Sequence, residues 1–155
     1  MDRKGKMLDS LRRLCSKREC CSSELRRRIA AEPELDAEAI LASLKEDGYL
    51  SDGRYARAFA RDKSALDGWG AIKIRYALKS KGIDDETIDA ALDEVDPEAS
   101  GNRLRKLLEA RNRALRDDPQ RRLKLIRYAL GRGYSYDEVS PVLRELGAGD
   151  EGSDG

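Results

Sequence analysis

The chain has 155 residues, of which 39% are charged, 39% are hydrophobic and only 5% are aromatic. This composition predicts thin hydrophobic cores and a large wetted surface, which fits a series of small modules better than one thick globule. The chain lacks histidine, which excludes mixed Cys/His zinc sites and the commonest general base, and no apolar run is long enough to span a membrane.

The net charge of +1 hides a regular alternation of sign along the chain. Net charges of +6, +6 and +8 belong to residues 1–31, 54–81 and 101–136, and net charges of −6, −8 and −5 belong to residues 32–53, 82–100 and 137–155. Basic stripes favour contact with a polyanion or with an acidic protein surface. For any single charged residue, mutual solvation and neutralisation of neighbouring helices is the simpler explanation.

The first two helices are predicted near the N-terminus. One covers about residues 6–17 and has its apolar residues on one face. These residues are Leu8, Leu11, Leu14 and Cys15. The next helix is expected to start with Ser22 as its N-cap, to carry Leu25 and Ile29, and to end near Pro33.

The cysteines Cys15, Cys20 and Cys21 lie close together in the sequence. Their odd number argues against a disulfide framework, and three thiolates do not complete a tetrahedral zinc site. We therefore expect reduced thiols in packing or surface roles, with no metal and no cofactor.

Three later helix starts share one device, in which an apolar residue precedes a polar N-cap and packs on the second turn of the helix. The N-caps are Asp36, Asp84 and Ser135, and the apolar residues before them are Leu35, Ile83 and Tyr134. Glu138 completes a capping box with Ser135, and Gly82 and Gly133 close the preceding helices in the left-handed conformation.

The segment Gly48-Tyr49-Leu50-Ser51 has the same features, with Ser51 as the cap of a helix that carries Tyr55 and Phe59. After it, Gly68-Trp69-Gly70 is expected to form a turn. Pro97 is expected to open a long helix, which Asp117-Asp118-Pro119 ends.

The pentapeptide Ile-Arg-Tyr-Ala-Leu occurs at residues 74–78 and again at residues 126–130, each time followed by a glycine, an apolar residue and a cap. A diverged copy lies upstream, with Leu25 and Ile29 in the matching places. The repeat predicts an all-α fold of three tandem three-helix modules, forming an elongated, curved molecule. The expected modules are 1–50, 51–96 and 97–146, with a disordered tail at 147–155.

No catalytic or nucleotide-binding pattern accompanies this fold, so a binding role is favoured over an enzyme. The candidate binding residues are cations at helical spacing and the single tryptophan. They are Arg26, Arg27, Arg28, Arg54, Arg57, Arg61, Lys63, Trp69, Lys73 and Arg75. Trp69 fits a turn-packing role as well as a contact role, whereas Tyr55, Phe59, Tyr76 and Tyr128 are expected in the core.

A second set of cations is either another basic surface or a solvated face. This set comprises Arg103, Arg105, Lys106, Arg121, Arg122 and Lys124.

The segment Gly48-Tyr49-Leu50-Ser51-Asp52-Gly53-Arg54-Tyr55-Ala56 resembles the signature of the RecX regulatory proteins, Gly-Tyr-Leu-Asp-Asp-x-Arg-Phe-Ala. Further matches in the same order are Arg61-x-Lys63, Gly68-Trp69-Gly70-Ala71-Ile72-Lys73-Ile74 and Lys81-Gly82-Ile83. The departures are mild, although Lys73 replaces an arginine and so loses a bidentate fork.

The resemblance covers nearly the whole chain and implies tandem three-helix repeats. It also implies binding to the RecA recombinase along the groove of its filament on DNA, with inhibition of ATP hydrolysis, strand exchange and co-protease activity. We accordingly expect a cytoplasmic, monomeric, non-enzymatic regulator that meets DNA directly or through the filament and has no membrane partner. The alternative is an independent helical DNA-binding module, although no symmetric-dimer signal supports it.

Overall fold

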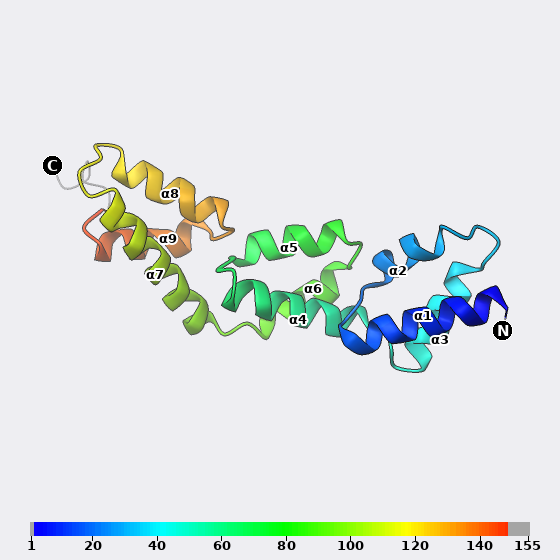
Figure 1. The fold of residues 1–155 in the computed structure, drawn as a ribbon. Helices are drawn as coiled ribbons and strands as arrows, with labels where there is room; N and C mark the ends of the chain where they lie inside the picture. Colours follow the sequence, from blue (N-terminus) through cyan, green and yellow to red (C-terminus); the bar gives the residue numbers. More distant parts are fainter. Residues whose placement is uncertain (1, 149–155) are drawn as a thin grey trace. The chain divides into compact units, whose positions relative to one another are not determined.

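The computed structural model describes residues 2–148, and all regular structure within them is helical (Figure 1). The helices in chain order are α1 (Arg3–Lys17), α2 (Ser22–Ile29), α3 (Ala37–Glu46), α4 (Asp52–Ala65), α5 (Ala71–Ser80), α6 (Asp85–Asp93), α7 (Pro97–Ala114), α8 (Arg121–Gly131) and α9 (Tyr136–Glu145). The predicted all-α class is confirmed. No helix in this part of the chain is both long and apolar enough to cross a membrane.

The chain divides into two compact units, which we describe separately. Unit 1 consists of Met1–Phe59 and Leu78–Ala91, and unit 2 consists of Ala60–Ala77 and Leu92–Gly155. The division falls within α4, α5 and α6, so the module boundaries predicted after residues 50 and 96 stay predictions.

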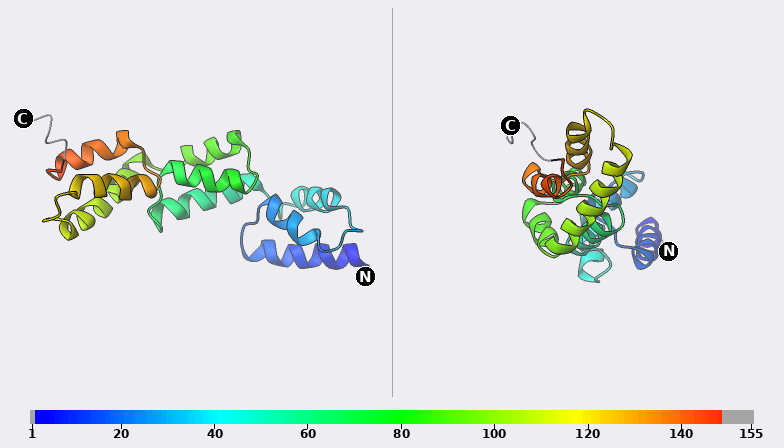
Figure 2. Two further views of the ribbon diagram at one scale, coloured as in Figure 1. Left: turned by 90° about the horizontal axis from the view of Figure 1, so that it is seen from above. Right: turned by 90° about the vertical axis from the view of Figure 1, so that its left-hand side faces the viewer.

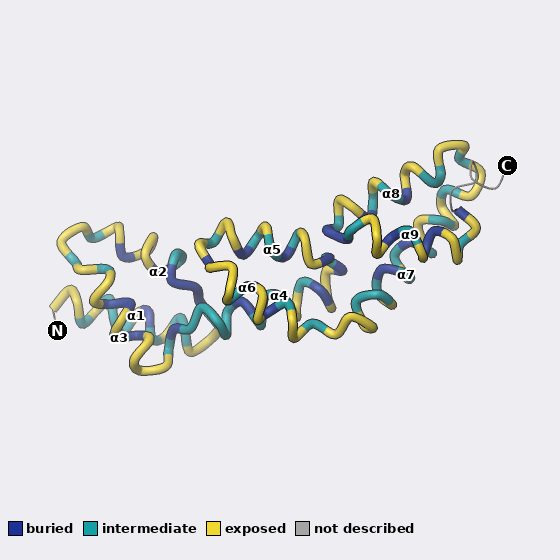
Figure 3. Tube along the Cα trace, turned by 180° about the vertical axis from the view of Figure 1, so that it is seen from behind, coloured by how far each residue is buried: buried dark blue, intermediate teal, exposed yellow. Residues whose placement is uncertain are grey.

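Unit 1 has its core where α1 and α2 pack on α3. Apolar residues spaced three or four apart on these helices lie on the covered faces, as the burial pattern in Figure 3 shows. The buried residues of this core are Leu11, Cys20, Leu25, Ile29, Ile40, Leu41, Leu44 and Leu50. Burial raises the pKa of the Cys20 thiol to about 12, and a hydrogen bond with Cys15 raises it in the same direction. At neutral pH this thiol is therefore protonated and acts as a packing residue.

Unit 2 has its core where α7, α8 and α9 pack on one another (Figure 2). The buried residues are Leu104, Leu108, Leu125, Ala129, Tyr134, Val139, Val142, Leu143 and Ala148. Ala148 belongs to the predicted disordered tail, yet it is buried and its N–H donates to the Leu143 carbonyl at 2.8 Å. Gly147 permits this return with a φ of +71°. The other residues of the predicted tail, 149–155, lie outside the described residues.

The three predicted helix caps Asp36, Asp84 and Ser135 are confirmed. Asp36 accepts from the Ala39 N–H at 3.2 Å, and Asp84 accepts from the Thr87 N–H at 2.8 Å. Ser135 and Glu138 form the capping box, with each side chain accepting a backbone N–H of the other residue.

One predicted cap is wrong, because Cys21 is the N-cap of α2 and Ser22 is its first helical residue. The side chain of Ser22 is directed instead to Asp52. A serine that can cap a helix is equally able to donate to a nearby carboxylate, and here the tertiary partner determines which occurs.

Unit 1 also contains an ion pair that spans the turn between α1 and α2. The Arg18 guanidinium donates to Glu24 through Nη1 at 3.1 Å and Nη2 at 2.5 Å. This bidentate bond holds the pKa of the Glu24 carboxyl below its usual value. The stabilisation is therefore present above the unfolded-state pKa of about 4.3 and is lost as the pH falls through the lower, folded-state pKa.

We expect Glu24→Gln to lower the urea midpoint at pH 7 and to lose less stability than the parent chain on acidification, because the paired carboxylate is gone. The exposed Glu46 forms no ion pair within residues 2–148, so Glu46→Gln is the matched control. Urea unfolding at pH 7 and pH 3.5 measures both variants. An acid response of Glu24→Gln equal to that of the parent chain would contradict the assignment.

Candidate functional site

The signature segment at residues 48–56 joins elements within unit 1. Asp52, at the start of α4, accepts from the Ser22 N–H at 2.7 Å and from the Ser22 hydroxyl at 2.8 Å. Arg54 donates to Glu19 at 3.2 Å and to the Gly48 carbonyl at 2.8 Å. These bonds fasten the start of α4 to the start of α2, so two polar residues of the signature have a structural role.

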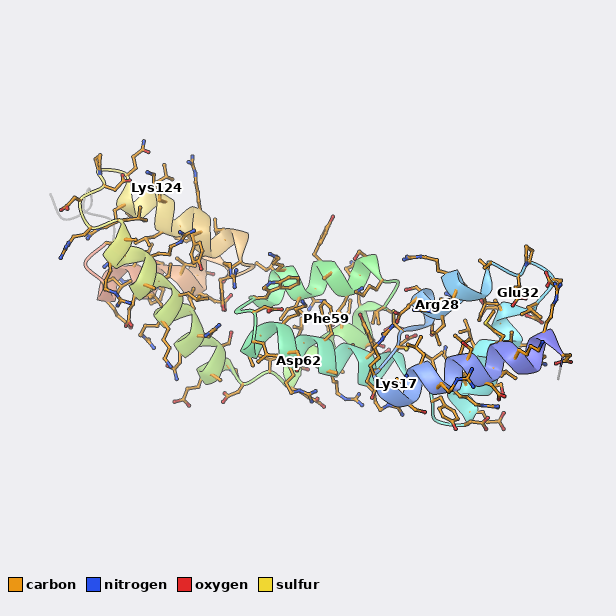
Figure 4. All side chains as sticks on the ribbon, in the orientation of Figure 1. Lys17, Arg28, Glu32, Phe59, Asp62 and Lys124 are labelled. Carbon is orange, nitrogen blue, oxygen red and sulfur yellow. The ribbon has the colours of Figure 1, made fainter. Side chains whose placement is uncertain are left out.

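The three arginines predicted on α2 differ in their surroundings. Arg26 forms an ion pair with Glu38, with Nε and Oε1 2.8 Å apart. Arg27 and Arg28 are exposed and make no ion pair with any other residue in 2–148 (Arg28 is labelled in Figure 4). Two of the three guanidinium groups are thus open to an external anion.

The predicted cations on α4 also separate into groups. Arg57 is half-buried, whereas the Arg61 side chain is 72% exposed and lies 3.5 Å from Asp62, which is labelled in Figure 4. Exposed pairs of adjacent residues contribute little to stability, so Arg61 can exchange Asp62 for another anion at small cost.

Trp69 is covered by lysines within unit 2. The Lys73 Nζ lies 4.5 Å from the ring centroid and the Lys63 Nζ lies 4.8 Å from it, while Lys63 also pairs with Asp67 at 2.9 Å. Each cation–π contact contributes about 0.5–1 kcal/mol at such a site. The structure therefore brings together three of the predicted residues, and it favours the turn-packing role for Trp69.

The turn Gly68-Trp69-Gly70 is bonded to the loop between α8 and α9, also within unit 2. The Gly70 N–H donates to the Arg132 carbonyl at 2.8 Å, and the Ile72 N–H donates to the Gly133 carbonyl at 3.0 Å. The buried Tyr134 hydroxyl donates to the Gly68 carbonyl at 3.0 Å. A Cβ at Gly70 would overlap the Gly133 backbone, so this close approach requires glycine.

Tyr76, predicted in the core, is 78% exposed on α5, and Ile72 one turn earlier is 57% exposed. The prediction was wrong because Ile74 and Leu78 define the buried face of α5, and a residue two positions away points to the opposite side of a helix. Helical geometry applied to the sequence could have found this exposed pair. Arg75, half-buried, lies between them in the sequence.

The second copy of the pentapeptide places its tyrosine differently. Tyr128 is half-buried against the core of unit 2, and the Arg111 guanidinium carbon lies 4.2 Å from its ring centroid. Identical local sequences therefore yield one bare tyrosine and one covered tyrosine, because the neighbouring helix supplies the cover.

Unit 2 contains a mostly apolar pocket of about 450 Å³. Its charged residues are Arg105, Glu138 and Glu145. Arg105 and Glu145 are paired at 2.8 Å, and Glu138 accepts the Ser135 N–H at 2.9 Å. Both carboxylates are already bonded, which makes the pocket a poor site for acid–base chemistry. Within residues 2–148, no group of three potential metal ligands occurs.

Comparison with known proteins gives matches along the chain. The family model for "RecX, second three-helix domain" matches residues 51–92, and that for "RecX, third three-helix domain" matches residues 102–143. Regulatory protein RecX of Pectobacterium atrosepticum is 34% identical over 136 residues, which cover 85% of this chain and 83% of that protein. Regulatory protein RecX of Shigella boydii is 30% identical over 161 residues, which cover 92% of each chain.

The fold is also similar to solved structures. The crystal structure of RecX from Lactobacillus salivarius has a TM-score of 0.82 at 22% identity and covers 93% of this chain and 96% of its own. A second crystal structure of regulatory protein RecX has a TM-score of 0.80 at 24% identity and covers 94% of this chain and 73% of its own.

Proposed function

Because this chain belongs to the RecX family of regulatory proteins, we propose that it binds the RecA recombinase filament on DNA and inhibits its ATPase, strand-exchange and co-protease activities. The observation that carries the proposal is the match to proteins named regulatory protein RecX over most of both lengths. The protein acts in the cytoplasm as a monomer, without cofactor or catalysis, in DNA repair and recombination.

The geometry supports a division of labour among the candidate residues. Arg54, Lys63 and Lys73 are engaged with neighbouring groups within their own units and hold the helices on which they lie. Arg27, Arg28 and Arg61 are exposed and supply charge toward the filament and its DNA. Such rim charges mainly raise the rate of association and its dependence on salt.

The apolar part of the proposed contact is the exposed pair on α5, Ile72 and Tyr76, with Arg75 beside it in the sequence. Tyrosine and arginine are enriched among the residues that dominate binding energy at protein interfaces. Partner contact also gives a physical reason for two large apolar side chains to face solvent.

Charge reversal of the α4 cations tests the proposal. The double variant Arg57→Glu, Arg61→Glu is expected to bind RecA filaments on single-stranded DNA at least about tenfold more weakly, because two attractive charges become repulsive. Fluorescence anisotropy of the labelled protein on preformed filaments measures the affinity, and circular dichroism checks folding. Unchanged affinity in a folded double variant would exclude the face of α4 that carries Arg57 and Arg61 from the contact.

The same assay discriminates against the alternative of an independent DNA-binding module. The proposal requires binding to RecA filaments to be much tighter than binding to naked DNA. Tight, sequence-selective binding to naked duplex DNA would favour the alternative.

A further inference from the structure

A second cavity lies in unit 2, where α7 and α8 border a groove of about 400 Å³ that the proposed contact with RecA does not use. Its lining residues are Arg111, Leu115, Lys124, Arg127 and Tyr128. Three of the five are cations, and the other two are a leucine and a tyrosine. This groove therefore combines positive charge with an apolar and aromatic surface.

The cations of this groove exceed the carboxylates that could neutralise them. Lys124 pairs with Asp118 at 2.5 Å, and the same carboxylate accepts the Gln120 N–H at 2.7 Å. Neither Arg111 nor Arg127 forms an ion pair with any carboxylate in residues 2–148. Two guanidinium groups thus border one groove without an anion, which makes it attractive to a negatively charged ligand.

The planar groups of the groove narrow the choice of ligand. The Arg111 guanidinium lies over the Tyr128 ring, with 4.2 Å between the guanidinium carbon and the ring centroid. Nucleic-acid bases stack on aromatic rings and on guanidinium planes, and arginine forks pair with phosphate oxygens. A duplex hides its base faces, so a single strand is the form that can use both the planar groups and the charges.

We propose that the α7–α8 groove binds single-stranded nucleic acid, with Arg127 and Lys124 on the phosphates and a base against the exposed Arg111 guanidinium, which itself lies on the Tyr128 ring. The binding is weak and independent of sequence, because the groove offers stacking and charge rather than hydrogen bonds to base edges. The inference rests on the proposed function for its setting, the DNA inside a RecA filament, but the groove itself is tested without RecA.

The test measures binding of a short fluorescent oligothymidylate to the full chain at low and at raised salt. Arg127→Glu is expected to weaken binding at least about tenfold, whereas Arg113→Glu is expected to have a much smaller effect. Arg113 is exposed on α7 outside the groove. Both variants replace an arginine by a glutamate, so they change the net charge by the same amount and differ only in position. An abasic strand and a duplex of the same length are expected to bind more weakly than the oligothymidylate.

Equal losses in the two variants would overturn the inference, because only the total charge would then matter. Equal affinity for the abasic strand or the duplex would overturn it as well, as would absence of binding at low salt. If Arg127→Glu does not fold, Arg127→Gln with Arg113→Gln as its control replaces the pair.

RecA ATPase measured with the same variants separates this inference from the proposed function. If the parent chain binds no free strand and Arg127→Glu still relieves inhibition of RecA, the groove is a protein contact; the inference then fails and the function stands. If the parent chain binds the strand through the groove and leaves RecA unaffected, the inference stands and the function fails.

Discussion

Replacement of Gly70 by alanine is expected to destabilise unit 2 by about 3 kcal/mol, the upper end of the range for an overpacked site. An added Cβ would overlap the carbonyl carbon and oxygen of Gly133 and lie 2.6 Å from the Tyr134 nitrogen. These are backbone atoms, which cannot rotate away as a flexible side chain can. Relief requires the turn at residues 68–70 to separate from the α8–α9 loop, which breaks the hydrogen bond from the Gly70 N–H to the Arg132 carbonyl.

Gly101→Ala is the matched control for this prediction. Gly101 lies inside α7 and has no heavy atom within 4 Å of an added Cβ, so alanine should stabilise the helix by up to about 1 kcal/mol. The free energies of unfolding in urea compare the two variants. Equal stability of Gly70→Ala and Gly101→Ala would show that the turn at residues 68–70 does not pack on the α8–α9 loop as described.

The second large effect is expected on function, from Tyr76→Ala. The side chain is 78% exposed, so its removal should leave the folding stability nearly unchanged. If Tyr76 anchors the contact with RecA, its loss costs about 2 kcal/mol of binding, or roughly 30-fold in the concentration needed to inhibit RecA. Inhibition of RecA ATPase by increasing amounts of the variant measures this shift.

Leu66→Ala supplies the control for Tyr76. Leu66 is 72% exposed and follows the end of α4, so the variant removes a similarly exposed apolar side chain that does not belong to α5. It is expected to inhibit RecA as well as the parent chain does. A shift of the same size in both variants, or none in Tyr76→Ala, would remove α5 from the proposed contact.

Much of the fold could be predicted from the sequence because its signals are local. The caps Asp36, Asp84 and Ser135 each bind a backbone N–H within three residues, so their partners are visible in the sequence. The glycines closing helices, Gly82 and Gly133, likewise have the expected positive φ. Such short-range devices depend little on the rest of the molecule.

The long-range contacts could not be predicted. Asp52 accepts hydrogen bonds from Ser22, which lies 30 residues earlier in the chain. Gly70 lies against the backbone of Gly133, which belongs to the loop between α8 and α9. Nothing in the segment around Gly68-Trp69-Gly70 indicates that its partner is the α8–α9 loop, because a glycine turn has many structural uses. The resemblance to the RecX signature includes these glycines, but it does not indicate that they join the start of α5 to the α8–α9 loop.

The candidate site was predicted only in part, for a related reason. The cations could be read from the sequence, but the carboxylates that pair with Arg26 and Arg54 lie 12 and 35 residues away along the chain. The groove on α7 and α8 needs Arg111 to meet Tyr128, which depends on how the two helices pack. Tyr76 differs, because its outward position follows from helical geometry and Ile74 alone.

We propose that this helical chain restrains RecA through surface contact and without catalysis. The most direct test of this claim is ATP hydrolysis by RecA on single-stranded DNA during titration with the purified protein, at two salt concentrations. We predict that hydrolysis falls to a low plateau as the protein is added and that more protein is needed at the higher salt, because part of the attraction is electrostatic. A hydrolysis rate that stays constant throughout the titration at both salt concentrations would contradict the claim.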